Sequence, residues 1–305
     1  MNGEKAMWKF EAEQKKYRIG NVEVGGVPGE RPTVLVGSIF HHKHRVVRDE
    51  QKGEFDRKTA EALINLQHEF SDKTGNPCML DVVGSTPEAL EKFIDFAAEV
   101  SDGPLLLDGV SESVRLPVLD HVKAAGLSER IVYNTVSPRA SEGELEKIKE
   151  AGIKSAVLLI CPKAGFGSKE RVATAKELLK TVKKAGVEKP LIDTCILDVP
   201  TLGFACRTIT QLKNELGAVM GGGAHNAVDT WRGLRSKMGL PAVKPAEASA
   251  NILIAAAGAD FILYGPLENA EYVFPTVAMV DAAFAQLRME EGVRISREHP
   301  KYRIA

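Results

Sequence analysis

Short runs of apolar residues recur along the chain from Thr33 onward, separated by longer segments in which apolar residues return at helical spacing. Most of these runs are continuously apolar, which is typical of parallel strands buried on both faces. The predicted strands span residues 33–39, 78–83, 104–110, 130–136, 155–161, 190–195, 218–220 and 260–264. Strands and helices that alternate in this order predict a (β/α)8 TIM barrel.

The segments between the strands carry the start and stop signals of helices. Before the helical segment that carries Glu88, Lys92 and Glu99 on its polar side, Ser85-Thr86 offers a hydroxyl cap and Pro87 suits the first helical position. Glycine tolerates the left-handed conformation just past a helix C-terminus, so Ala-Gly pairs mark helix exits. These exits are Ala125-Gly126, Ala151-Gly152, Ala185-Gly186 and Ala257-Gly258.

Residues 1–32 precede the barrel pattern and are predicted to form an N-terminal extension. Residues 17–24 alternate in polarity on either side of Gly20-Asn21, which favours a β-hairpin. We expect this hairpin to close one end of the barrel by covering its apolar side chains. The predicted division is therefore an extension at 1–32 and a barrel at 33–305.

Composition narrows the class of protein. The chain has 305 residues and a formal net charge of -1, which fits one large α/β domain and gives no electrostatic basis for binding nucleic acid or anionic membranes. The longest apolar runs are shorter than the roughly 20 residues of a membrane span, and the polar N-terminus lacks a signal-peptide core. We therefore expect a cytoplasmic protein with no membrane span.

The cysteines predict neither a disulfide framework nor a zinc ribbon. Cys78, Cys161, Cys195 and Cys206 have no CxxC spacing, and three of them lie in or beside apolar runs. Buried free thiols are the default interpretation.

Polar residues stand where several predicted strands end, and in such a barrel all these ends meet at the face that binds ligands. They are Asp81, Asp108, Asn134, Asp193, His225 and Asn226. A carboxylate accepts two parallel N–H bonds, and an amide both donates and accepts, so the set fits a neutral ligand rich in donors, such as a pterin ring. The glycines 221–223 would let a flat ring or a partner approach the backbone.

Other interpretations use some of the same residues. Each acid or amide can simply cap a loop. His41, His42 and His44, with His225, suggest a metal hydrolase, although a histidine-rich loop after one strand lacks the ligand geometry of a catalytic metal, so we predict no metal. A Schiff-base aldolase would need a lysine inside the barrel, and Lys163 follows its strand. Dihydropteroate synthesis would need a diphosphate site, and no phosphate loop is evident.

Four segments closely resemble the H subunit of tetrahydromethanopterin S-methyltransferase and its bacterial relatives. They are GSIF at 37–40, SDKTGNPC at 71–78, DVVGSTPE at 81–88 and DTCILDVP at 193–200. The resemblance covers nearly the whole chain and extends, more distantly, to the pterin-binding barrels of methyltetrahydrofolate:corrinoid methyltransferases and dihydropteroate synthases. It identifies Asp108, Asn134 and Asp193 with the positions that hold the pterin, and Asn226 with an asparagine near N5.

The resemblance implies methyl transfer from a methylated corrinoid, such as methylcobalamin, to N5 of a reduced pterin. We expect Asp193 to bind the amide and amino edge of the pterin, Asn134 and Asp108 the other ring nitrogens, and Asn226 to orient N5, with Asp81 at the same rim. We favour tetrahydrofolate, as in glycine betaine or methylamine demethylation. The alternative is a tetrahydromethanopterin-binding subunit of a membrane complex, inactive alone.

The chain lacks an Asp-x-His-x-x-Gly corrinoid motif, because Asp120-His121 does not continue in that way. The corrinoid is therefore expected on a partner protein that docks at an open barrel mouth. We expect His41, His42, His44, Gly221, Gly222 and His225 to face it. Related barrels also suggest a homodimer.

Overall fold

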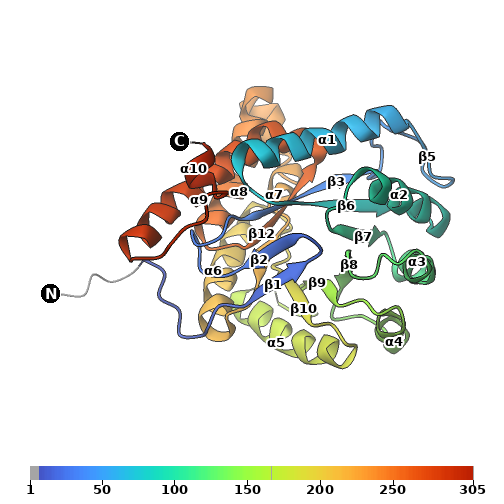
Figure 1. The fold of residues 1–305 in the computed structure, drawn as a ribbon, viewed down its shortest axis with the longest axis horizontal. Helices are drawn as coiled ribbons and strands as arrows, with labels where there is room; N and C mark the ends of the chain where they lie inside the picture. Colours follow the sequence, from blue (N-terminus) through green and yellow to red (C-terminus); the bar gives the residue numbers. More distant parts are fainter. Residues whose placement is uncertain (1–6, 166, 305) are drawn as a thin grey trace.

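A computed structural model describes residues 7–165 and 167–304 of the chain. Its centre is a closed barrel of parallel strands in the order β10-β11-β12-β3-β6-β7-β8-β9, with helices arranged around it (Figure 1). The barrel strands are β3 (Val34–Ile39), β6 (Cys78–Gly84), β7 (Leu105–Gly109), β8 (Ile131–Val136), β9 (Ser155–Leu159), β10 (Lys189–Asp193), β11 (Met220–Gly222) and β12 (Phe261–Pro266). The predicted (β/α)8 barrel is confirmed.

A helix follows each barrel strand in the chain. The helices are α1 (Arg57–Thr74), α2 (Pro87–Val100), α3 (Glu112–Ala124), α4 (Glu142–Glu150), α5 (Ser168–Lys184), α6 (Val199–Leu216), α7 (His225–Asp229), α8 (Val243–Ala256), α9 (Ala270–Glu290) and α10 (Pro300–Arg303). Short helical turns lie at Leu234–Met238, Leu240–Ala242 and Leu267–Asn269. Within the described ranges, no helix is both long and apolar enough to cross a membrane.

The local signals in the sequence act as expected. The Thr86 side chain accepts from the backbone N–H of Ala89 and caps α2, with Pro87 as its first residue. The glycines that follow α3, α4, α5 and α8 are in the left-handed region, with φ between 71° at Gly126 and 98° at Gly258. Predicted and observed strand bounds differ by up to two residues, and the strand predicted at 218–220 is shifted as a whole by two residues toward the C-terminus and includes two glycines.

The strands divide the apolar side chains between two cores, because successive residues of a strand point to opposite sides. In β3, Val34 and Val36 face the barrel axis, whereas Leu35 packs outward against the helices. The inner core comprises Val34, Val36, Met79, Leu106, Val132, Val157, Leu191, Val219, Phe261 and Leu263, together with residues of an N-terminal hairpin.

That hairpin covers one end of the barrel. β1 (Lys16–Ile19) and β2 (Val22–Gly25) pair antiparallel, with Ile19 opposite Val22 across the Gly20-Asn21 turn. Both of these side chains join the inner core, and Figure 1 shows the hairpin lying across the ring of strands. A second short hairpin, β4 (Val47–Asp49) with β5 (Glu54–Phe55), lies in the chain between β3 and α1.

A buried ion pair ties this end together. Lys213 of α6 donates to both carboxylate oxygens of Asp260, at 2.7 and 2.8 Å, and to the carbonyl of Gly26 at 3.0 Å. Asp260 also accepts from the backbone N–H of Met220 at 2.8 Å. The pair thus links a helix, the hairpin and the starts of β11 and β12.

Replacing Lys213 by Met should lower the free energy of unfolding by about 3–5 kcal/mol, because it leaves the Asp260 carboxylate buried without its partner. Urea unfolding at pH 7 measures the loss. Lys147→Met is the matched control, since it breaks the exposed pair with Asp120 and should leave the midpoint unchanged. Equal losses in the two variants would contradict the assignment of the buried pair as structural.

Candidate functional site

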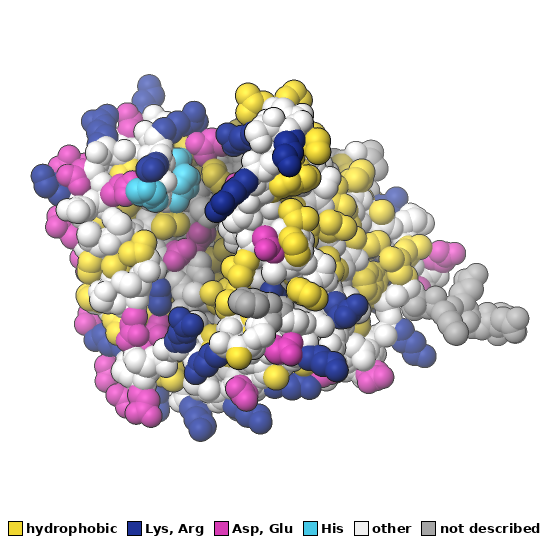
Figure 2. Space-filling model, turned by 180° about the vertical axis from the view of Figure 1, so that it is seen from behind, with side chains coloured by type: hydrophobic (Ala, Val, Ile, Leu, Met, Phe, Trp, Pro, Cys, Tyr) yellow, Lys and Arg dark blue, Asp and Glu magenta, His cyan; other side chains and the backbone are white. Residues whose placement is uncertain are grey.

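A cavity of about 490 Å³ lies at the C-terminal ends of the strands. Figure 2 looks onto the molecule from behind the view of Figure 1, where histidine side chains gather beside a furrow containing acidic side chains. The cavity is lined by Ser38, His41, Asp81, Val83, Asp108, Asn134, Thr135, Val157, Leu159, Asp193, Gly223, His225, Asn226, Asp229, Leu263, Gly265 and Pro266. It therefore brings together every acid and amide that the sequence analysis singled out.

The alternation of the strands explains this convergence. Asp193 follows the inner-core residue Leu191 by two positions, and Asn134 follows Val132 in the same way. Ser38, Asp81 and Asp108 are related to Val36, Met79 and Leu106 by the same spacing. Since residues two apart share one side of a strand, the apolar filling of the barrel continues upward as a polar layer.

Three of these residues are joined by hydrogen bonds. The Ser38 hydroxyl donates to Asp81 Oδ2 at 2.7 Å, and Asn134 Nδ2 donates to Asp81 Oδ1 at 3.1 Å. The contact with Asp81 also fixes which way the Asn134 amide is turned, because only its NH2 group can donate. The amide oxygen of Asn134 is thereby left to accept from a ligand.

Two neighbouring carboxyls of the cavity differ in how strongly their surroundings disfavour the ionised form. Burial raises the pKa of Asp81 and that of Asp108, and the charge of Asp81 raises the pKa of Asp108 further. The bonds from Ser38 and Asn134 favour the ionised form of Asp81. The surroundings of Asp108 therefore favour its protonated form more strongly than those of Asp81 do, and a protonated Asp108 can donate to a ligand atom that only accepts.

Asp193 is the last residue of β10, and the turn after it orients its side chain. Its Oδ1 accepts the backbone N–H of Cys195 at 2.7 Å. Cys195 has a φ of 58°, and its carbonyl accepts from the buried Arg171 of α5 at 2.8 Å. Burial raises the pKa of Asp193 to about 6, while the Cys195 N–H opposes that rise. A ligand that donates N–H groups to Asp193 would favour its ionised form.

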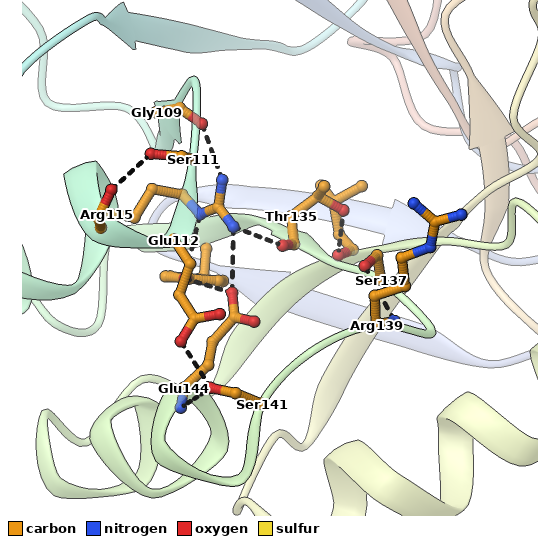
Figure 3. A network of polar contacts seen from close by, with 12 residues as sticks. Gly109, Ser111, Glu112, Arg115, Thr135, Ser137, Arg139, Ser141 and Glu144 are labelled. Atoms are coloured by element: carbon orange, nitrogen blue, oxygen red, sulfur yellow. Dashed lines mark hydrogen bonds and ion pairs between the residues drawn. The ribbon is translucent and has the colours of Figure 1, made fainter.

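Arg115 of α3 holds the ends of two strands that carry cavity residues (Figure 3). Its guanidinium donates to the carbonyl oxygens of Gly109, at 2.7 Å, and Thr135, at 3.4 Å. These residues directly follow Asp108 and Asn134 in the chain. Arg115 therefore sets the spacing between two neighbouring polar side chains without lining the cavity itself.

Arg115 is in turn anchored from two sides. Its Nε donates to the Tyr133 hydroxyl at 3.0 Å, and its Nη2 lies 3.1 Å from Glu144 Oε1 of α4. The Tyr133 hydroxyl donates to the same oxygen of Glu144 at 2.6 Å. Because all three side chains are largely buried, this network is stiff and resists changes in the loops after β7 and β8.

The predicted histidines separate into two groups. His41 and His225 line the cavity. His42 is exposed. His44 is buried beneath His41, and the two rings stack with 4.4 Å between their centroids. The Nε2 atom of His44 lies 3.3 Å from Glu268 Oε1. His42 and His44 thus lie outside the cavity. Over the described ranges, no three His, Cys, Asp or Glu side chains are placed to hold a metal ion.

Two of the three consecutive glycines lie in close contact with neighbouring protein atoms. A methyl group on Gly221 would lie 2.2 Å from the Phe261 carbonyl oxygen, and one on Gly222 would lie 2.7 Å from Thr194 Oγ1. Of the three, Gly223 lines the cavity. Close packing between β11 and its neighbours accounts for Gly221 and Gly222, and the expectation that they face a corrinoid stays a prediction.

Sequence reasoning overlooked some residues of the site. Ser38 stands at the end of the first barrel strand, in the same inward register as the acids, and that spacing could have identified it. Asp229 is one helical turn after His225, so its position would have followed from the helix. Arg115 lies in mid-helix, and no signal in the sequence connects it with the strand ends.

Solved structures with the same fold include dihydropteroate synthases. The enzyme from Xanthomonas albilineans aligns with a TM-score of 0.60 and 17% identity, covering 90% of this chain and 98% of that one. The enzyme from Yersinia pestis, solved with a pterine-sulfa conjugate, aligns with a TM-score of 0.60 and 14% identity over 90% and 100% of the two chains. At these identities, the likeness supports the pterin-binding type of barrel as a fold.

Sequence relatives are much closer. A family model for the tetrahydromethanopterin S-methyltransferase MtrH subunit matches residues 12–296. The H subunit of tetrahydromethanopterin S-methyltransferase from Methanosarcina acetivorans is 36% identical over 98% of this chain and 100% of its own length. The H subunit of a putative methyltransferase, mtx, from Methanosarcina mazei is 38% identical over 96% and 98%. The chain therefore belongs to the family of the tetrahydromethanopterin S-methyltransferase MtrH subunit, a family of methyltransferases.

Proposed function

We propose that this protein transfers a methyl group from a methylated corrinoid on a partner protein to N5 of tetrahydrofolate, giving 5-methyltetrahydrofolate and a Co(I) corrinoid. The observation that carries the proposal is the convergence of Asp81, Asp108, Asn134, Asp193 and Asn226 on one cavity. These side chains provide two or more hydrogen-bond acceptors and at least one donor for a flat ring that is rich in donors. This combination matches the edges of a pterin.

In this proposal each side chain has a separate role. Ionised Asp193 accepts from the amide N–H and the amino group of the pterin as adjacent donors. The Asn134 oxygen and the Asp108 proton meet the remaining ring nitrogens, with Asp81 supporting both. Asn226, near the start of α7, directs its amide oxygen at N5, where positive charge develops as N5 attacks the methyl carbon.

The protein supplies alignment rather than a nucleophile. The reaction is a displacement at carbon, in which the N5–CH3 bond forms as the CH3–Co bond breaks and its electron pair remains on cobalt. Holding N5, the methyl carbon and cobalt in line can contribute part of the roughly 7–11 kcal/mol available to well-oriented reactants. The stiff network behind Asp108 and Asn134 supports such alignment.

The corrinoid-carrying partner would dock around the cavity mouth. Thr230, next to the cavity residue Asp229, donates to the carbonyl of Leu197, which joins two exposed loops. The apolar side chains exposed there are Leu197, Trp231, Met238 and Leu240, and Figure 2 shows a projecting lobe that carries basic and apolar side chains beside the furrow. Exposed apolar groups next to a ligand cavity are typical of a partner-binding surface.

Tetrahydromethanopterin is the alternative acceptor, within a subunit that is inactive unless assembled with other chains. Relatives such as the Methanosarcina acetivorans protein favour it, since they are subunits of tetrahydromethanopterin S-methyltransferases. Cytoplasmic function is part of both versions of the proposal. A single assay with the two pterins distinguishes them.

The purified protein should demethylate methylcobalamin in the presence of tetrahydrofolate, as followed by loss of the methyl-Co(III) absorbance. Asp193→Asn should lose about 10²-fold or more in kcat/KM, because losing two charge-assisted hydrogen bonds costs about 3 kcal/mol or more. Asp120→Asn, on the exposed surface, is the control. Activity with tetrahydromethanopterin alone would establish the alternative acceptor, and an Asp193→Asn variant as active as wild type would refute the role of Asp193.

The same substitution should make the ligand-free protein more stable at pH 7.5. Because burial raises the pKa of Asp193 to about 6, the folded state holds the proton more tightly than the unfolded chain. Ionisation therefore disfavours folding increasingly from about pH 4 to pH 6, by up to roughly 3 kcal/mol above that window. Asparagine removes this cost but can still accept from Cys195.

Urea unfolding of wild type and Asp193→Asn at pH 7.5 and at pH 4 measures this effect. The variant should be more stable at the higher pH, and the difference should shrink toward zero at the lower one. Such a result also shows that any loss of activity is not a loss of folding. A variant that is less stable than wild type at both pH values would contradict the raised pKa.

A homodimer is also part of the proposal. Phe204 on α6 and Leu253 on α8 are 38% and 51% exposed, on helices that pack side by side. Light scattering should give about twice the monomer mass of 33.1 kDa, and Phe204→Asp should shift the species toward the monomer because it places a charge in an apolar contact. A wild-type monomer at micromolar concentration would refute the dimer.

A further inference from the structure

Methyl transfer to N5 leaves a proton that must be removed. N5 of a tetrahydropterin is a secondary amine with one hydrogen. When its lone pair forms the N5–CH3 bond and the CH3–Co bond breaks toward Co(I), the nitrogen has four substituents and a positive charge. The neutral methylated product forms only when this N–H proton passes to a base, and none of the roles proposed for the cavity residues is that of a base.

We infer that Nε2 of His225 accepts this proton, which makes His225 a catalytic base of the site. The inference rests on the proposed function and adds one group to it. Three features of the described structure support it: the tautomer of the ring, its position beside Asn226, and the charges around it.

The contact with Leu263 sets the tautomer. His225 Nδ1 lies 3.0 Å from the Leu263 carbonyl oxygen. A carbonyl can only accept, so in the neutral ring Nδ1 carries the hydrogen and Nε2 carries the lone pair. Nε2 has no hydrogen-bond partner among the described residues, and the ring lines the cavity. The free acceptor of the imidazole is therefore available to a ligand.

The backbone around the ring fixes its position next to Asn226. A methyl group on Gly265 would lie 3.1 Å from His225 Cγ, so β12 leaves just enough room for the ring. A methyl group on Gly223 would lie 3.4 Å from His225 Cε1 and 2.8 Å from Asn226 Nδ2. The imidazole and the amide thus approach one point from two sides. A base so close to the group that orients N5 is within reach of the N5 proton.

Carboxyl groups of several strands surround the His225 ring. Asp81 on β6 and Asp193 on β10 occupy opposite places in the barrel order. A positive charge on His225 opposes the rise that burial causes in the pKa of each of them. Asp81 and Asp193 therefore lie within electrostatic range of the His225 ring. The other titratable groups here are Asp108, Asp229 and His41, with Glu268 next to His41.

The other candidate bases are less suited. Both oxygens of Asp81 already accept, from Ser38 and Asn134. Asp193 is engaged with the pterin edge in the proposed function, and burial and the charge of Asp81 raise the pKa of Asp108, which favours its protonated form. Burial lowers the pKa of His41, which weakens it as a base, and its Nδ1 lies 3.2 Å from the carbonyl oxygen of His42.

The test is a single-turnover assay with methylcobalamin and whichever tetrahydropterin the wild type accepts. His225→Gln retains a donor for the Leu263 carbonyl but is not a base, so its transfer rate should fall by about 10²–10⁴-fold, the usual contribution of a general base. Its pterin Kd, measured by calorimetry, should remain that of wild type. The dependence of the wild-type rate on pH should flatten in the variant.

His225→Ala provides a second, independent readout. Added imidazole should restore its rate in proportion to the concentration of the unprotonated form, because the small base can enter the space left by the ring. His121→Gln is the matched control, since that histidine is bonded to Asp95 on the outside of the barrel, and it should behave as wild type.

Each unfavourable outcome has a distinct meaning. A His225→Gln variant that transfers at the wild-type rate would overturn the inference and leave the proposed function intact. So would a variant that loses pterin affinity and rate together without rescue by imidazole, because that result indicates a structural role. A wild-type protein that transfers methyl groups to neither pterin, and removes none from the methylated pterins with Co(I), would overturn the proposed function and this inference with it.

Discussion

Barrel closure imposes the constraint from which the other features of the molecule follow. Once the strands form a closed ring, every second side chain of each strand faces the axis. Val36, Leu106 and Leu191 fill the lower part of that space, and the next inward positions carry Ser38, Asp108 and Asp193. The same alternation that builds the apolar core therefore also places the polar groups in one cavity. Their positions follow from the strands and do not depend on the conformation of the loops.

Collecting these polar groups has a cost in the empty protein. Burial raises the pKa of Asp81, Asp108 and Asp193 alike, so the site is less favourable for folding at neutral pH than an apolar one would be. A ligand that donates to these carboxyls would offset part of the cost. In the ligand-free protein, the Arg115 network holds the ends of β7 and β8 in place, because it ties them to α4.

The fold and the family carry different information about function. Dihydropteroate synthases share this barrel at 17% identity or less in the two alignments described, which shows how far the scaffold tolerates changes of side chain. The chemistry depends on which groups stand at the strand ends and what reaches the open mouth. Here a polar layer lines the cavity at the strand ends, and Trp231, two residues after the cavity residue Asp229, is exposed.

The strands, the helix caps, the N-terminal hairpin and the acids and amides of the cavity were all predictable from the amino-acid sequence, because they follow from local periodicity and from the rule that parallel strand ends share one face. Three other features emerge with the folded chain: His41 lines the cavity whereas His44 is buried beneath it, Gly221 and Gly222 accommodate Phe261 and Thr194, and Arg115 joins two strand ends. Those features depend on contacts between residues distant in the chain, and no local pattern encodes them.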